Sequence, residues 1–379
     1  MVRLTRCRRR TLLLLAALAL ALLPAGALAN AGPPRRAGDT GGPLLPGTSD
    51  QVHVLGEELR FDLGPDLGSA TVTARYRLAN RGPDLEDQRF VFVVQDVGGR
   101  TDLAVSWNGE PVPVRLGMDQ LGPEELAEMA RAWTSVDQWL DPVTGEPYEA
   151  EFYGSDPVLR YYLFSLDMPA GAEGELAVTY DHTAGSDRTR YTYRVHHYSY
   201  LLLPARGWAS FGPLQIRVAA PAGSRYYFAA NLDFRDEGGE YVAEYPGLPE
   251  ANLTFAVMNR AGLFLGPQPG PYYGLGFALV LVLSAAVGVG IGRLAGRLPR
   301  PALATGVGVL AALVPTGPAL VWLSVLLLSS GLPQLRDQAY ASAFAGFATG
   351  LVGAALCAAV AGWTARGTWR RRRPAGGPG

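Results

Sequence analysis

The chain has almost no cysteine. Of its 379 residues only Cys7 and Cys357 are cysteines, one near the N-terminus and one in a long apolar run near the other end. The sequence between them offers no disulfide and no thiolate metal site. A domain in that region must therefore be stabilised by a hydrophobic core, for which the chain is long enough.

Lysine is absent altogether, and isoleucine occurs only at Ile216 and Ile291. This composition is typical of a GC-rich bacterial genome. The same bias enriches arginine, alanine and glycine, so their abundance alone does not indicate a function.

Common catalytic and metal-binding motifs are also missing. There is no His-Glu-x-x-His, Gly-x-Ser-x-Gly or Gly-x-x-x-x-Gly-Lys pattern. The four histidines are scattered, and the adjacent His196 and His197 would point to opposite faces of a strand. Neighbouring acids such as Glu57 and Glu58 indicate a solvated surface. We therefore predict no catalytic residue, cofactor or metal site.

Apolar segments are plentiful. Residues 1–29 combine an arginine-rich start, the apolar run Leu12 to Leu23 and Ala27-Leu28-Ala29, and these features predict a cleaved signal peptide. An uncleaved signal anchor is the alternative. Residues 273–294, 302–330 and 339–363 are each long enough to cross a bilayer as helices. Their interiors lack charge, which favours an anchor over a transport pathway.

The arginines fix the predicted orientation. Arg293, Arg297 and Arg300 follow the first span, and residues 364–379 form a basic tail. With three spans both basic flanks lie in the cytoplasm, as the positive-inside rule requires, and the N-terminal domain lies outside the cytoplasmic membrane. A fourth span, created by a break at Pro315, would place the tail outside. We expect a kink or a re-entrant turn there instead.

The predicted external part consists of a linker at 30–50, a domain at 51–262 and a second linker at 263–272. Residues 30–270 hold 33 of the 34 acidic and 19 of the 33 basic residues, a net charge of −14. Such a domain repels nucleic acid and anionic lipid.

Alternation of apolar residues predicts a mainly β domain of one or two antiparallel sandwiches. From Ala70 to Leu78, every second residue starting at Val72 is apolar. Asn108-Gly109 predicts a tight hairpin, and the prolines that follow predict an edge strand. Further strands are expected at 161–166, 175–180, 190–203, 214–219, 226–230, 241–245 and 253–258. One amphipathic helix is expected from Gly122 to Leu140, covering a sheet.

The segment from Arg190 to Tyr200 predicts a contact surface. As one strand it would place Arg194, His196, Tyr198 and Tyr200 together on the exposed face, where aromatic and arginine side chains suit a protein partner. Stacking of these side chains for stability alone is the competing interpretation.

Several turn and strand-end segments carry a family resemblance. They are Tyr76-Arg77-Leu78-Ala79-Asn80, Trp107-Asn108-Gly109-Glu110-Pro111-Val112, Pro169-Ala170-Gly171 with the following Leu176-Ala177-Val178-Thr179-Tyr180, and Leu203-Pro204-Ala205-Arg206-Gly207-Trp208. Over residues 51–260 the chain resembles uncharacterised secreted bacterial β-sandwich proteins. The resemblance implies a fold and an exported location, and it transfers no activity.

The sequence thus favours a membrane-anchored extracytoplasmic binding or interaction module. Its expected partners are the lipid bilayer and another membrane or cell-envelope protein, not nucleic acid. Two alternatives remain open: an extracytoplasmic hydrolase without a recognisable motif, and an accessory subunit of a transport or export complex.

Overall fold

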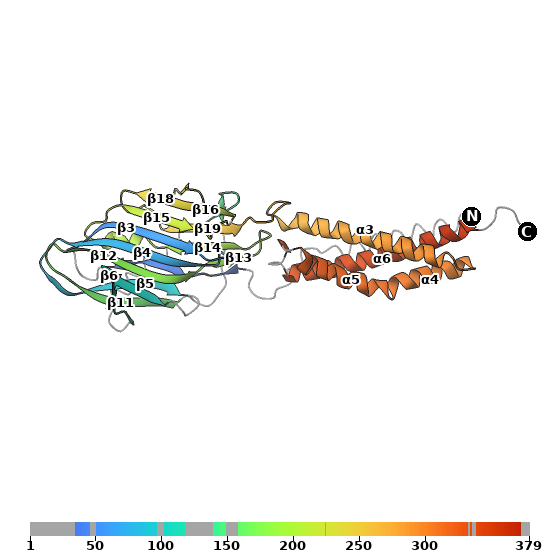
Figure 1. The fold of residues 1–379 in the computed structure, drawn as a ribbon, viewed down its shortest axis with the longest axis horizontal. Helices are drawn as coiled ribbons and strands as arrows, with labels where there is room; N and C mark the ends of the chain where they lie inside the picture. The colour runs from blue at the N-terminus through green and yellow to red at the C-terminus, as the bar shows by residue number, and fades with distance from the viewer. Residues whose placement is uncertain are drawn as a thin grey trace, which may run out of the picture. The chain divides into compact units, whose positions relative to one another are not determined.

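The computed structural model describes residues 35–45, 51–96, 102–117, 139–148, 158–223, 225–332, 334–335 and 339–372. They divide into two compact units, one within Gly32–Ala261 and one within Gly262–Gly379 (Figure 1). The predicted signal peptide and residues 122–138 of the predicted helix lie outside the described residues. Leu140, expected at the end of that helix, instead lies in the short strand β9 (Trp139–Leu140), which pairs with β10 (Pro147–Tyr148).

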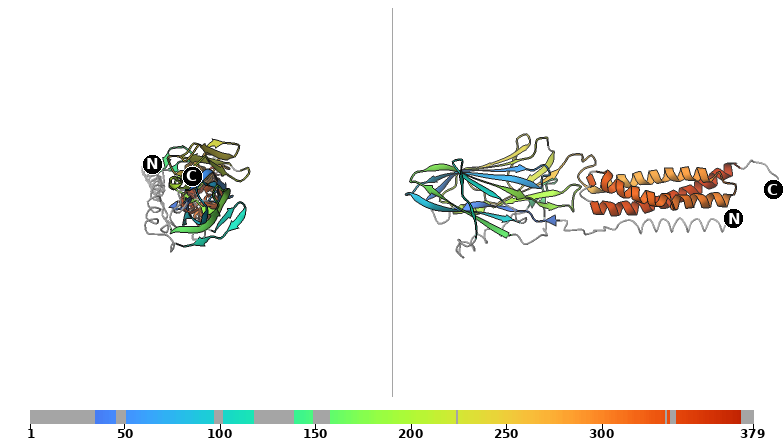
Figure 2. Two further views of the ribbon diagram at one scale, coloured as in Figure 1. Left: turned by 90° about the vertical axis from the view of Figure 1, so that its left-hand side faces the viewer. Right: turned by 60° about the horizontal axis from the view of Figure 1, so that its bottom comes forward.

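Two large sheets pack face to face in the first unit and share one core, so the unit is a single β-sandwich (Figure 2). The eight-stranded sheet has the order β17-β18-β15-β3-β4-β12-β6-β7. Its strands are β3 (Val52–Leu63), β4 (Ser69–Asn80), β6 (Leu103–Trp107), β7 (Glu110–Val112), β12 (Glu173–Thr183), β15 (Leu214–Ala219), β17 (Arg235–Asp236) and β18 (Glu240–Tyr245).

The nine-stranded sheet has the order β1-β13-β14-β2-β5-β11-β8, with β19 paired to β14 and β16 paired to β19. Its strands are β1 (Arg35–Arg36), β2 (Thr40–Leu45), β5 (Leu85–Asp96), β8 (Arg115–Leu116), β11 (Val158–Met168), β13 (Gly185–Asp187), β14 (Val195–Tyr200), β16 (Tyr226–Ala230) and β19 (Leu253–Asn259). Most pairings are antiparallel, as expected, but those of β15 with β3 and of β14 with β2 are parallel, so both sheets are mixed.

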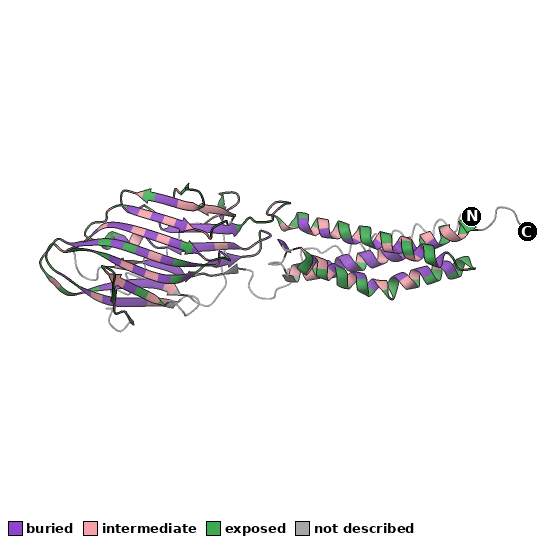
Figure 3. Cartoon of the chain, viewed as in Figure 1, coloured by how far each residue is buried: buried purple, intermediate pink, exposed green. Residues whose placement is uncertain are grey.

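Aromatic side chains fill the interior of the sandwich. Phe61 of β3 is fully buried, and its ring lies 5.1 Å from that of Phe255 in β19. Tyr198 stacks on Phe255 at 4.7 Å. Figure 3 shows the resulting alternation of buried and exposed residues along the strands. The predicted inward set on β4, from Val72 to Leu78, is buried as expected.

The predicted hairpin is confirmed. Asn108 and Gly109 have φ angles of 51° and 84° and connect β6 to β7, which forms the edge of its sheet. Both residues suit these positive φ angles, and the proline in β7 leaves no ladder hydrogen bond unmade at an edge.

Among the described residues, the second unit contains three helical segments long and apolar enough to cross a membrane, which is the architecture of a multi-pass membrane protein. They consist of α3 (Pro269–Ala295), then α4 (Pro301–Leu313), α5 (Thr316–Leu326) and the π-helix η2 (Leu327–Gly331), and finally α6 (Ala339–Arg372).

In the middle span the helix is interrupted at Pro315, between α4 and α5, and the span continues to Gly331. Proline has no N–H to donate to the carbonyl four residues earlier. The Thr316 hydroxyl donates instead to the Ala311 and Ala312 carbonyls, each at 2.8 Å. The hydroxyl thus provides a hydrogen-bond donor to backbone carbonyls, which lipid could not do.

Candidate functional site

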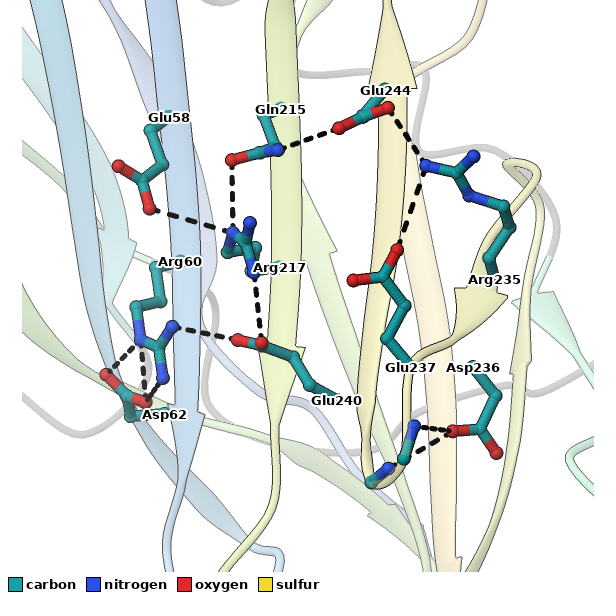
Figure 4. Close-up of polar contacts among 12 residues, drawn as sticks. Glu58, Arg60, Asp62, Gln215, Arg217, Arg235, Asp236, Glu237, Glu240 and Glu244 are labelled. Carbon is teal, nitrogen blue, oxygen red and sulfur yellow. Dashed lines mark hydrogen bonds and ion pairs between the residues drawn. The ribbon is translucent and has the colours of Figure 1, made fainter.

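The outer face of the eight-stranded sheet carries a continuous set of charged side chains (Figure 4). On β3 the residues Leu59 and Phe61 point into the core, so Glu58, Arg60 and Asp62 point outward. Strands β15 and β18 add outward polar residues beside them. Period-two alternation therefore builds this surface from segments far apart in the sequence.

Ion pairs link the strands across this face. Glu240 of β18 accepts from Arg60 at 2.8 Å and from Arg217 of β15 at 3.0 Å. Arg60 also contacts Asp62 at 2.9 Å. All four side chains are at least a quarter exposed, so each pair contributes little to stability by itself, and the network mainly fixes side-chain positions.

A groove of about 530 Å³ lies beside this network. Its charged lining comes from four strands: Glu58 of β3, Arg75 and Arg77 of β4, Glu175 of β12 and Glu244 of β18. A second hollow of about 340 Å³ shares Glu58 and Arg75 with it. The groove has the size of a small-molecule site and presents both signs of charge.

Arg77 and Glu175 differ from the other charged residues of the groove. They are directly opposite each other on β4 and β12, and both are exposed. Within the described residues neither forms an ion pair, and the Arg77 guanidinium makes only a 3.4 Å hydrogen bond to the Leu55 carbonyl. By contrast, hydrogen bonds from Gln215 and Arg235 hold the pKa of Glu244 below its ordinary value.

Glu57 lies on the inner side of β3, contrary to the expectation of a solvated Glu57-Glu58 pair. A β-bulge between Val54 and Gly56 changes the phase of the strand, so Glu57 is only 6% exposed. Burial raises the pKa of its carboxyl to about 8, and a hydrogen bond with Tyr76 offsets a part of that rise. Glu57 is therefore mostly protonated at neutral pH.

The predicted contact strand is shorter and more buried than expected. Strand β14 begins at Val195, and bends precede it. Tyr198 and Tyr200 are 0% and 1% exposed and belong to the core, so the prediction that they lie on an exposed face is wrong. Arg194 and His196 are half-buried, and a role for these two in binding a partner stays a prediction.

The reason is that the face of β14 that carries Tyr198 and Tyr200 is turned into the core, and the opposite face is covered as well. One face looks into the sandwich, where Tyr198 packs on Phe255. On the other face, the ring of His197 lies 5.7 Å from Trp139 and 5.0 Å from Tyr148, which come from β9 and β10. The β9–β10 hairpin is thus part of the packing around β14.

A buried carboxylate attaches this hairpin to the segment before β14. Asp141 is fully buried and accepts hydrogen bonds from Arg190 at 2.7 Å and from Tyr191 at 2.6 Å. Its burial would raise its pKa, but the hydrogen bonds from Tyr191, the Val143 N–H and Arg190 outweigh that effect and lower it. The distinctive sequence around Arg190 therefore has a structural role here.

Within the described residues, no three His, Cys, Asp or Glu side chains come close enough together to hold a metal ion. His182 is fully buried, and burial lowers the pKa of its imidazole to about 3.

No family model matches the chain, and no curated protein matches its sequence. Among solved structures, a "putative nutrient binding protein" from Legionella pneumophila is similar at 14% identity, with a TM-score of 0.39 over 59% of this chain and 72% of that one. An M1 zinc metallopeptidase from Deinococcus radiodurans has 14% identity and a TM-score of 0.27 over 55% of this chain and 42% of its own.

The leukotriene A4 hydrolase of Saccharomyces cerevisiae has 10% identity and a TM-score of 0.30, over 56% of this chain and 31% of that enzyme. The chain thus spans less than half of the two enzymes it resembles. Similarities at this level do not indicate a function.

Sequence reasoning missed the groove because its residues are brought together only by sheet topology. Glu58 and Gln215 become neighbours through the parallel pairing of β3 with β15, which no local pattern indicates. The available signal was the alternation of charged with apolar residues in β3 and β4, which correctly marks an exposed face.

Proposed function

We propose that the chain is a membrane-anchored binding module whose β unit takes up a polar, mixed-charge ligand in the groove between Arg77, Glu175 and Glu244. The observation that supports this is which charged side chains of the sheet face form ion pairs and which do not. Most acids and bases on this sheet face neutralise each other, whereas Arg77 and Glu175 form no ion pair among the described residues.

The two side chains offer complementary contacts. A guanidinium binds a carboxylate through two parallel hydrogen bonds, and a carboxylate accepts from an ammonium group. A ligand with both groups, such as a short peptide with free ends, would satisfy Arg77 and Glu175 together, and a volume of about 530 Å³ accommodates it.

The proposal includes an orientation. The β unit lies outside the cytoplasmic membrane and the end of α6 lies inside, because arginines gather at the C-terminal ends of both α3 and α6 while the β unit is acidic. Labelling of single cysteines in intact cells, in a variant without Cys7 and Cys357, tests it. A cysteine placed in the tail must be protected from an impermeant reagent, and one at Arg206 must react.

The binding test uses the full chain in detergent and triglycine as the probe, measured by isothermal titration calorimetry. Triglycine with free ends is expected to bind, and triglycine with acetylated and amidated ends is not. Arg77→Gln and Glu175→Gln should each weaken binding by about tenfold or more, since each removes one charge-assisted hydrogen-bonding partner.

Arg81→Gln is the matched control, because Arg81 is an exposed arginine next to β4 that is paired with Glu173 at 2.8 Å away from the groove. The proposal would be refuted if the free and the blocked peptide bound equally well. It would also be refuted if the groove variants and the control lost the same amount of affinity.

A further inference from the structure

Seven arginines gather at one end of the helical unit. The topology of the unit brings them together. The turn between α3 and α4 lies at this end, and α6 ends on the same side because the chain forms three successive spans. All seven are exposed: Arg293, Arg297, Arg300, Arg366, Arg370, Arg371 and Arg372. We call this set the basic end of the bundle.

Direct contacts hold the two parts of the basic end together. The Trp369 indole N–H of α6 donates to the Pro299 carbonyl in the α3–α4 turn at 3.1 Å. Gly296, which follows α3, lies so close to α6 that a Cβ there would be 2.6 Å from the Thr368 Cβ and 2.9 Å from the Ala365 carbonyl. The turn and the last turns of α6 therefore form one surface.

The positive charge of this surface is not compensated within the unit. Residues 262–379 contain a single acidic residue, Asp337, and it precedes α6, at the opposite end of that helix from the arginines. Among the described residues, no carboxylate lies within ion-pair distance of the seven guanidinium groups. A multivalent cationic surface of this kind requires anions from outside the chain.

The position of the seven arginines along the helices identifies the source of those anions. With 34 residues α6 is about 51 Å long, whereas the hydrocarbon core is about 30 Å thick. Trp363 is 75% exposed, and tryptophans in this position mark the interface of a bilayer. The arginines that follow Trp363 then lie at the level of the lipid phosphates, and guanidinium groups bind phosphate bidentately.

We propose that the basic end is a binding site for the headgroups of anionic phospholipids, in which Arg297 and Arg300 of the turn and Arg370 of α6 contact the same lipid phosphates. The site requires both chain segments, so the bound lipid bridges the α3–α4 turn and the end of α6. It is independent of the groove in the β unit.

The full chain in detergent, supplied with equal amounts of phosphatidylglycerol and phosphatidylcholine, tests this by native mass spectrometry. Phosphatidylglycerol should be retained in preference by about fivefold or more, the factor that corresponds to about 1 kcal/mol for one arginine at an anionic surface. High salt should reduce the preference, because these charges are exposed. This salt titration needs no variant.

A triple variant, Arg297→Gln with Arg300→Gln and Arg370→Gln, should lose the preference. The control triple, Arg115→Gln with Arg206→Gln and Arg225→Gln, removes the same charge from exposed positions of the β unit and should keep it. Equal retention of both lipids by the unmodified chain, or the same loss in both triples, would overturn the proposal. So would displacement of the lipid by inorganic phosphate at equal concentration, which would indicate a site for free anions, or by a DNA duplex.

Discussion

The two units of this chain pack by opposite means. In the β unit, large rings such as Phe61, Phe255 and Tyr198 fill the space between two sheets. In the helical unit the contacts depend on the absence of side chains. A Cβ at Gly288 would lie 2.6 Å from the Cys357 carbonyl, and one at Gly292 would lie 2.5 Å from the Ala361 carbonyl.

The difference follows from the solvent of each unit. Water drives apolar rings into the interior of the sandwich, so the apolar area buried there stabilises it. Lipid is as apolar as leucine, so helices in a bilayer gain little from burying apolar area and associate through close van der Waals contact instead. Glycine and alanine are abundant throughout the sequence, and here they are used at specific positions of α3 and α6.

Removing volume from the β unit should have the largest effect. Phe61→Ala eliminates a fully buried ring that contacts Tyr198, Tyr200 and Phe255. We expect a loss of about 3–5 kcal/mol in the free energy of unfolding of this unit. Hydrogen exchange of peptides from β4 and β12 in the full chain measures it without interference from the helices.

Leu116→Ala is the control for that experiment, because Leu116 is 56% exposed. It should change the same free energy by less than about 0.5 kcal/mol. A similar loss in both variants would mean that the rings of the sandwich do not carry its stability.

Adding volume to the helical unit should have the next largest effect. Gly292→Leu forces α3 away from the α6 backbone at Ala361, and we expect a destabilisation of the bundle by about 1–3 kcal/mol. Gly290→Leu is the matched control two residues away, where no heavy atom lies within 4 Å of an added Cβ. Reversible unfolding in mixed micelles compares them. Equal stability of both variants would contradict the packing described for α3 and α6.

The sequence predicted much of the fold because local physics decides much of it. The apolar alternation of β4 and the positive φ angles at Asn108 and Gly109 need no long-range information. Length and lack of charge were enough to predict the three spans. The parallel pairings were missed, since register between distant strands is set by the whole sheet rather than by either strand.

The candidate site was harder to predict for two physical reasons. First, alternation gives the two faces of a strand but not which face is turned to the core, and the face of β14 that carries Tyr198 and Tyr200 is turned into the sandwich. Second, one inserted residue inverts the phase, as the bulge before Glu57 shows. The sequence marked each charged groove residue as exposed, but it did not show that these residues lie close together.

The smallest expected effect concerns the carboxyl of Glu57, which is buried on the inner side of β3. The pKa of Glu57 is raised from 4.5 to about 8 in the folded chain, so between these values the folded state binds more protons than the unfolded state. This contribution to stability is complete below about pH 4.5 and is lost as the pH rises towards 8. Between about pH 6 and 7 the Glu57 carboxyl should lower the free energy of unfolding of the β unit by about 1.4 kcal/mol, against a smaller rise from His182, whose pKa is lowered to about 3. Glu57→Gln should therefore remove the fall. Glu58→Gln, on the outer face of the same strand, should leave it unchanged. Hydrogen exchange at several pH values, corrected for the intrinsic exchange rate, measures all three, and a fall that persists in Glu57→Gln would show that the buried carboxyl is not its source.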